Sequence, residues 1–131
     1  MAYISDALSL PDSHVSISPS LKELGFGVWE GKPFWELKAS PIYPADPDTR
    51  YSWRPEGGES YADGQDRLRH WLSGVQDPTV VVSHGAIGRC LIGHLTAINM
   101  RELVEIRMHQ GRFCRIAEGH AEWFDGTPLP P

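Results

Sequence analysis

The chain has 131 residues, 40% of them hydrophobic, and a formal net charge of −5. This length corresponds to one domain, and the ordinary apolar content is typical of a folded globular protein rather than a disordered one. The negative charge excludes a general nucleic-acid binder, which needs a basic face to displace counterions, and no apolar run approaches the length that crosses a bilayer.

Two features of the sequence favour a cytoplasmic location. The stretch MAYISDALSL at the N-terminus contains an acidic residue and no basic one, so it does not resemble a secretory signal. Cys90 and Cys114 are far apart, show no metal-ligand spacing and lie in predicted core elements. We therefore expect two free thiols in a reducing compartment, and neither a metal nor another cofactor.

The N-terminal half begins with a predicted helix within residues 1–10, where apolar residues recur at helical spacing until Pro11 ends the pattern. Residues 15–18 alternate apolar and polar, as a short strand does. The segments that follow are a glycine-rich loop over 21–31, one or two helical turns over 34–38, and a long Pro- and Asp-rich connection over 40–58 of the kind that forms a lid.

The C-terminal half contains the stronger patterns. Ser60 is a predicted helix N-cap, and the helical face after it consists of Tyr61, Leu68, Trp71, Leu72 and Val75. The run Val80–Val82 predicts a strand buried on both faces of a parallel sheet. A helix is expected over 86–98, with Ile87, Cys90, Leu91, Leu95 and Ile98 facing inward, and one more turn over 101–104. Residues 112–117 and 120–124 flank a turn and predict a hairpin, and the tail DGTPLPP cannot propagate regular structure.

This order of elements predicts a single α/β domain over residues 1–131, built in three α/β/α layers. In open parallel sheets, ligands bind where strands end and helices begin. The strand-to-helix junction at Ser83-His84-Gly85 is therefore a candidate ligand-binding site.

His84 and Gly85 close the valine run and open the next helix. A helix N-terminus offers unpaired N–H groups and a positive dipole to an anion, Gly85 permits close approach of the backbone, and a protonated His84 would add a donor. The alternative is a histidine that caps the helix or hydrogen-bonds within the core.

The segment LKELGFGVWEG, from Leu21 to Gly31, holds two carboxylates, Glu23 and Glu30, among glycines and large apolar residues. A carboxyl held against apolar surface favours its protonated form, which suits a general acid. A solvated glutamate remains the alternative for both. The segment RPEGGES, from Arg54 to Ser60, forms a turn into the next helix, and Glu59 would reach a pocket at the start of that helix.

Together and in this order, LKELGFGVWEG, PEGGES and VVVSHG resemble the histidine phosphatase superfamily, which includes phosphoglycerate mutases and broad-specificity phosphatases. The resemblance runs from Met1 to about Pro128 and extends to the closing hairpin of the bacterial phosphatase branch. It implies the phosphoglycerate mutase-like fold, with Glu23 as proton donor and His84 as the second histidine of the catalytic pocket. Gly85 and Ala86 would present backbone amides to the phosphate.

The family's nucleophile, the histidine of an Arg-His-Gly motif on the first strand, has no counterpart among these residues. The resemblance therefore implies a chain that lacks roughly the N-terminal third of a family member, with an incomplete sheet and negligible turnover by itself. None of the remaining histidines follows an arginine and precedes a glycine at a strand end: His14, His70, His94, His109 and His120.

The expected partner is a small phosphorylated metabolite or inorganic phosphate, and the parent activity a phosphomonoester hydrolase in preference to a mutase. The lid-like connection would set the substrate, with Trp35, Tyr43, Tyr51 and Trp53 lining a pocket. An exposed apolar sheet edge predicts homo-oligomers. The alternative to an enzyme is a non-catalytic phosphate-binding or interaction module, or a chain completed by a partner that supplies the missing strand.

Overall fold

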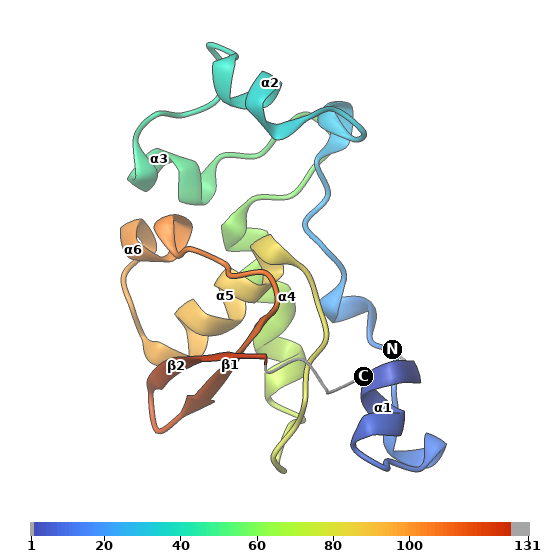
Figure 1. The fold of residues 1–131 in the computed structure, drawn as a ribbon. Coiled ribbons are helices and arrows are strands. Elements are labelled where there is room, and N and C mark those ends of the chain that lie inside the picture. The colour runs from blue at the N-terminus through green and yellow to red at the C-terminus, as the bar shows by residue number, and fades with distance from the viewer. Residues whose placement is uncertain (1, 127–131) are drawn as a thin grey trace.

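Two helices packed side by side, α4 (Tyr61–Leu72) and α5 (Gly85–Thr96), carry the core of the molecule (Figure 1). The computed structural model describes residues 2–126. Leu24, from the loop that precedes α4 in the sequence, is buried between the two helices, and the rest of this core cluster consists of Leu68, Ala86, Ile87, Cys90 and Leu91. The core is thus built around the residues that follow His84.

Helix α4 begins where the sequence predicts. The Ser60 hydroxyl accepts from the Asp63 N–H at 3.2 Å, and the Asp63 carboxylate accepts from the Ser60 N–H at 2.8 Å, so the capping box is complete. The helix ends at Leu72, and Val75, predicted on its apolar face, lies beyond it. Gly64 lets the two helices approach, because a Cβ there would lie 2.6 Å from Leu24 Cδ2 and 3.0 Å from Cys90 Sγ.

Helix α5 begins at Gly85 and ends at Thr96, because Ala97 takes a left-handed conformation with φ of 53°. The predicted helix over 86–98 is therefore correct in place and two residues too long at its end. Leu95, predicted to face inward, is 40% exposed. The buried face instead includes Ile92 and Gly93, which lies against Leu103.

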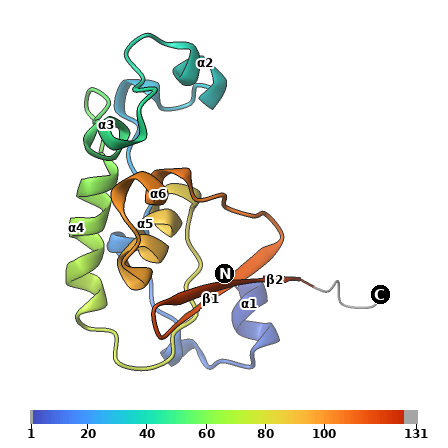
Figure 2. The same ribbon diagram turned by 90° about the vertical axis from the view of Figure 1, so that its left-hand side faces the viewer.

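Shorter helices surround this pair. They are α1 (Ala2–Ala7), α2 (Phe34–Ala39), α3 (Pro47–Ser52) and α6 (Met100–Glu105), with 3-10 turns at Asp12–His14, Pro19–Leu21 and Gly27–Trp29. Helices α2 and α3 lie beyond one end of the α4–α5 pair and α1 lies near the other (Figures 1 and 2). The connection over 40–58, predicted without regular structure, thus contains α3, which Asp46 caps through the Asp48 N–H.

The described residues form one sheet, the antiparallel hairpin of β1 (Arg112–Ala117) and β2 (His120–Asp125). The hairpin lies where the sequence predicts it. Its turn residues, Glu118 and Gly119, both have positive φ, as tight hairpins require. The hairpin packs against α5. The domain is α/β, as expected.

The two other predicted strands are not paired in this structure. Residues 15–18 and 79–84 belong to no sheet among residues 2–126. Val80 and Val82 are 64% and 44% exposed, whereas the sequence predicts that they belong to a strand buried on both faces of a parallel sheet. Only Val81 packs against the core. A strand needs a partner for its backbone N–H and C=O groups, and neither segment finds one here.

No helix within the described part of the chain is both long and apolar enough to cross a membrane.

Candidate active site

The amino-terminal end of α5 carries the predicted phosphate-binding residues. His84 is the N-cap residue, with extended backbone angles (φ −119°, ψ 173°) and no capping hydrogen bond from its side chain. The side chain is exposed, as is Gly85, whereas Ala86 is buried. One residue earlier, the Ser83 hydroxyl donates to the Leu21 carbonyl at 2.7 Å, which ties this junction to the 21–31 loop.

The carboxylate of Glu23 lies directly on that end of α5. Its Oε2 accepts from the Ala86 N–H at 3.1 Å, and its Oε1 accepts from the Ile87 N–H at 3.0 Å. Oε1 also accepts from the Leu24 N–H at 3.0 Å. The Ala86 and Ile87 amides belong to the first turn of α5, where N–H groups have no intrahelical acceptor. Glu23 therefore caps α5 from another part of the chain.

This geometry places Glu23 beside His84 and Gly85. A Cβ on Gly85 would lie 3.9 Å from Glu23 Oε2. The immediate surroundings of the carboxylate are polar N–H groups, whereas the sequence predicted an apolar setting. The other carboxylate of the loop, Glu30, is exposed and accepts from the Phe26 N–H at 2.6 Å, within its own loop.

Glu59, predicted to reach a pocket at the start of α4, lines a cavity there together with Ser60 and Tyr61, and it also holds the loop that carries Glu23. Its Oε2 accepts from the Gly25 N–H at 2.9 Å, and its own N–H donates to the Gly25 carbonyl at 2.8 Å. Its Oε1 forms an ion pair with Arg67 Nε at 3.2 Å. Arg67 is a residue that the sequence analysis did not single out.

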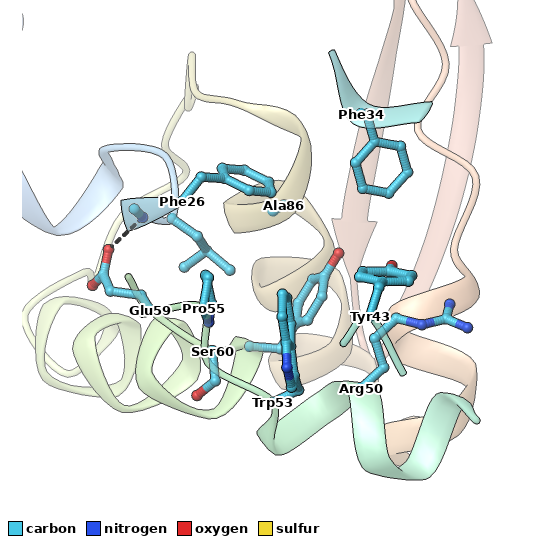
Figure 3. Close-up of a pocket in the computed structure, with 12 residues that line it drawn as sticks. Phe26, Phe34, Tyr43, Arg50, Trp53, Pro55, Glu59, Ser60 and Ala86 are labelled. Carbon is cyan, nitrogen blue, oxygen red and sulfur yellow. Dashed lines mark hydrogen bonds between the residues drawn. The ribbon is translucent and has the colours of Figure 1, made fainter. Parts of the chain in front are cut away.

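A small cavity of about 40 Å³, open to solvent, adjoins Ala86 and therefore the end of α5. Phe34 and Tyr43 lie on one side and Phe26 and Pro55 on the other (Figure 3). The Phe34 and Tyr43 rings meet edge to face at 5.9 Å, and Tyr43 meets Trp53 in the same way at 5.4 Å. The wall of this cavity, next to the amino-terminal end of α5, is thus rich in aromatic rings.

The predicted substrate-loop residues divide between this cavity and the surface. Trp53 lines the cavity, together with Glu59 and Tyr43. Trp35 is 71% exposed and lies outside the lining, as does Tyr51, whose hydroxyl donates to Gln65 at 2.6 Å. Phe34 was not predicted. Neighbouring helix positions such as 34 and 35 point about 100° apart, and tertiary packing decides which of them turns inward.

Burial raises the pKa of the Tyr43 hydroxyl above its usual value, although the nearby Arg50 guanidinium lowers it in part. Burial likewise raises the pKa of Tyr61, and the Arg89 guanidinium opposes this only in part. Both tyrosines therefore keep their protons at neutral pH. The Arg50 guanidinium is engaged with Glu105 and the Ala45 carbonyl. Its Cζ also lies over the Tyr43 ring, 5.4 Å from the ring centroid.

The cavity lining contains no histidine. Among residues 2–126, no group of three His, Cys, Asp or Glu side chains is placed to hold a metal ion. The histidines other than His84 lie in the Asp12–His14 turn, on α4 (His70), on α5 (His94), against Trp123 (His109) and in the hairpin (His120).

Comparison with known proteins gives one family. The model of the histidine phosphatase superfamily (branch 1) matches residues 1–124. No curated protein sequence matches the chain. Among solved structures, the native mycobacterial glucosyl-3-phosphoglycerate phosphatase is similar with a TM-score of 0.64 and 22% identity, over 81% of this chain and 55% of that one.

Two further structures give the same fold. The complex of the mycobacterial glucosyl-3-phosphoglycerate phosphatase with inorganic phosphate has a TM-score of 0.67 at 21% identity, and mycobacterial hydrolase 1 has 0.65 at 20%. Each alignment covers 94% of this chain and 67% of the other. The chain thus spans between about half and two-thirds of the length of these neighbours.

Proposed function

This chain belongs to the histidine phosphatase superfamily, and on that premise we propose that it binds the phosphate group of a phosphomonoester at the amino-terminal end of α5. The observation that carries the proposal is the position of Glu23, whose carboxylate lies on the Ala86 and Ile87 amides beside His84. The family resemblance assigns proton donation and phosphate binding to these two side chains.

The contacts indicate which groups hold Glu23 and which remain available to the phosphate. The Ala86 and Ile87 N–H groups hold Glu23, so the phosphate oxygens would contact the His84 imidazole and the Gly85 N–H, both exposed next to it. In an enzyme completed by the nucleophilic histidine, Glu23 would be the general acid that donates a proton to the alcohol oxygen, as the new N–P bond forms and the ester P–O bond breaks. Proton transfer of this kind contributes about 10²–10⁴-fold to a rate.

Hydrolysis through a phosphohistidine needs a second histidine, whose ring nitrogen bonds to phosphorus as the alcohol leaves. The cavity lining offers none, and the sequence contains no Arg-His-Gly triplet. We therefore propose that these 131 residues bind phosphate without turning over esters, and that activity requires a segment bearing the nucleophile.

The second candidate function is a non-catalytic phosphate-binding module, favoured by the same lack of histidine in the lining. The two candidates differ in one respect. An incomplete enzyme gains turnover when an Arg-His-Gly strand is supplied in trans, and a binding module does not.

The ligand is a small phosphorylated metabolite or inorganic phosphate. One structural neighbour is a complex with inorganic phosphate and is itself a glucosyl-3-phosphoglycerate phosphatase. In this chain the cavity beside the site is walled by Phe26, Phe34, Tyr43 and Trp53. Phosphatase chemistry is preferred to mutase chemistry, because the GVWEG and PEGGES segments resemble those of the phosphatase-type proteins of the family.

The test combines a binding and a turnover measurement. Inorganic phosphate is titrated into the purified chain and followed by NMR shifts of the Gly85 amide, and hydrolysis of p-nitrophenyl phosphate is measured in parallel. His84→Ala is the variant, and His94→Ala, on the same helix outside the cavity lining, is the control. Binding that requires His84 without turnover supports the proposal. Turnover by the chain alone contradicts it, and so does binding that is insensitive to His84→Ala.

We also propose that copies of the chain associate through the unpaired segment at Val80–Val82. Its exposed apolar side chains and free backbone groups are typical of an edge that pairs with another strand. Gel filtration of a Val80→Lys, Val82→Lys variant should show monomer where the wild type shows oligomer. Val28→Lys, at a 53% exposed site elsewhere, is the control. A monomeric wild type would contradict the proposal.

A further inference from the structure

We propose that Arg67 is a positioning residue that holds Glu23 against the end of α5 by bracing both sides of its loop. The catalytic meaning of this role rests on the function proposed above, whereas the bracing itself does not. Arg67 lies on α4, and its side chain is 17% exposed. Arg67 does not itself line the cavity, although its partner Glu59 does, so any effect on Glu23 passes through Glu59 and the loop.

On the N-terminal side of Glu23, Arg67 binds the backbone directly. Its Nη1 donates to the carbonyls of Pro19, Ser20 and Lys22 at 3.2, 2.9 and 3.0 Å. The regular structure of this stretch is one 3-10 turn, and no α-helix or strand fixes its path. Three carbonyls converging on one guanidinium nitrogen therefore define the path of the chain into Glu23.

On the C-terminal side, Arg67 acts through Glu59. The guanidinium contacts both carboxylate oxygens, with Nε 3.2 Å from Oε1 as an ion pair and Nη2 donating to Oε2 at 3.3 Å. Oε2 also accepts from the Gly25 N–H, two residues after Glu23. The Arg67–Glu59 pair therefore fixes the chain on both sides of the predicted acid.

The remaining contacts of the loop leave Glu23 dependent on this brace. Leu24 anchors it in the core, 5% exposed, Ser83 binds the Leu21 carbonyl, and the Glu59 N–H donates to the Gly25 carbonyl. None of these three contacts involves the Glu23 carboxylate. A partly buried guanidinium also costs free energy if its partners are lost, so Arg67 and the three carbonyls stabilise one another only in this arrangement.

The test uses the two amides that Glu23 accepts from. Hydrogen exchange of the Ala86 and Ile87 N–H groups is measured by NMR in the wild type and in Arg67→Met. Gly88 is the internal control, because its N–H donates to the His84 carbonyl within α5. Arg69→Met is the matched control, since Arg69 lies on α4 and forms an ion pair with exposed Asp66.

We expect Arg67→Met to speed exchange at Ala86 and Ile87 about tenfold, toward the value in Glu23→Ala, with Gly88 unchanged. Arg69→Met should leave all these amides within about twofold of the wild type. Unchanged exchange at Ala86 and Ile87 in Arg67→Met overturns the proposal. Equal acceleration at Gly88 also overturns it, because the effect would then be general loosening of α5.

Two milder variants keep the test decisive if Arg67→Met fails to fold. Arg67→Lys retains the charge, but one ammonium group cannot serve both the carbonyls and Glu59. Glu59→Gln removes the negative charge and one acceptor oxygen, and keeps the other oxygen for the Gly25 N–H. Both should give intermediate acceleration at Ala86 and Ile87, and wild-type exchange in both refutes the brace. Phosphate titration separates the proposals. Wild-type chain that fails to bind phosphate disproves the function and leaves the exchange result standing.

Discussion

Replacing Glu23 tests whether the predicted acid also stabilises the fold. Glu23→Ala removes the acceptor of the Ala86, Ile87 and Leu24 N–H groups. His84, the local N-cap residue, makes no capping bond that would take over. We therefore expect the variant to lose stability through the first turn of α5.

The magnitude follows from the contacts. Removing a side-chain N-cap costs about 0.5–2 kcal/mol, and hydrogen bonds to a charged acceptor are worth about 1.5–3 kcal/mol when shielded from water. Glu23 is half-buried, so solvent screening reduces the larger figure. We expect Glu23→Ala to lower the free energy of unfolding by about 1–2 kcal/mol, and Glu23→Gln, which keeps one acceptor oxygen, by about half of that.

The assay is urea unfolding followed by far-ultraviolet circular dichroism, comparing midpoints at constant slope. Glu30→Ala is the control, because exposed Glu30 accepts one N–H within its own loop and should cost less than half as much. A His84→Asp substitution placed in the Glu23→Ala variant supplies a local N-cap and should restore about 0.5–1 kcal/mol. A Glu23→Ala loss below about 0.3 kcal/mol, or an equal loss in Glu30→Ala, would refute the reasoning.

Three further outcomes are expected. Gly64→Ala should lower the free energy of unfolding by about 1–2 kcal/mol, measured by urea unfolding, because its Cβ would lie 2.6 Å from Leu24 Cδ2. This loss should outweigh the better helix propensity of alanine. A stabilised variant would show that α4 and α5 can separate. The pKa of Asp63 is lowered from 3.8 to about 2, chiefly by the Ser60 N–H. About 1–2 kcal/mol of stability present above pH 4 should therefore be lost as the pH falls toward 2. The Asp63→Asn variant should lack this component of acid unfolding. Burial raises the pKa of Cys90 to about 12, so a thiol reagent should modify the native chain only at Cys114 and label Cys90 only after unfolding; labelling of Cys90 in native protein would show that the core opens.

Local patterns were predicted correctly where neighbouring residues satisfy one another. The Ser60–Asp63 capping box lies within one turn, and the 112–117 and 120–125 strands are joined by a tight turn. The start of α5 was likewise predicted, because the valine run ends at His84-Gly85 and apolar residues at helical spacing follow. In each case the residues that define the element lie within a few positions of one another.

Pairing was not predictable in the same way. The Val80–Val82 run has the composition of a buried strand, yet both outer valines are exposed here because no described segment pairs with it. Apolar β-branched residues favour an extended backbone, whereas burial depends on a partner elsewhere in space. Residues 15–18 likewise have the alternating pattern of a strand, yet they pair with no described segment.

By itself, the sequence determined the family motifs, the α/β class and the candidates Glu23 and His84. It left Glu30 as a competing carboxylate and gave no sign of Arg67. Only the tertiary structure decided these points, since Glu23 meets amides 63 and 64 residues away and Arg67 meets carbonyls 45 to 48 residues away. Hydrogen bonds across such separations leave no periodic pattern in the sequence, because they depend on how the loop and the two helices pack together.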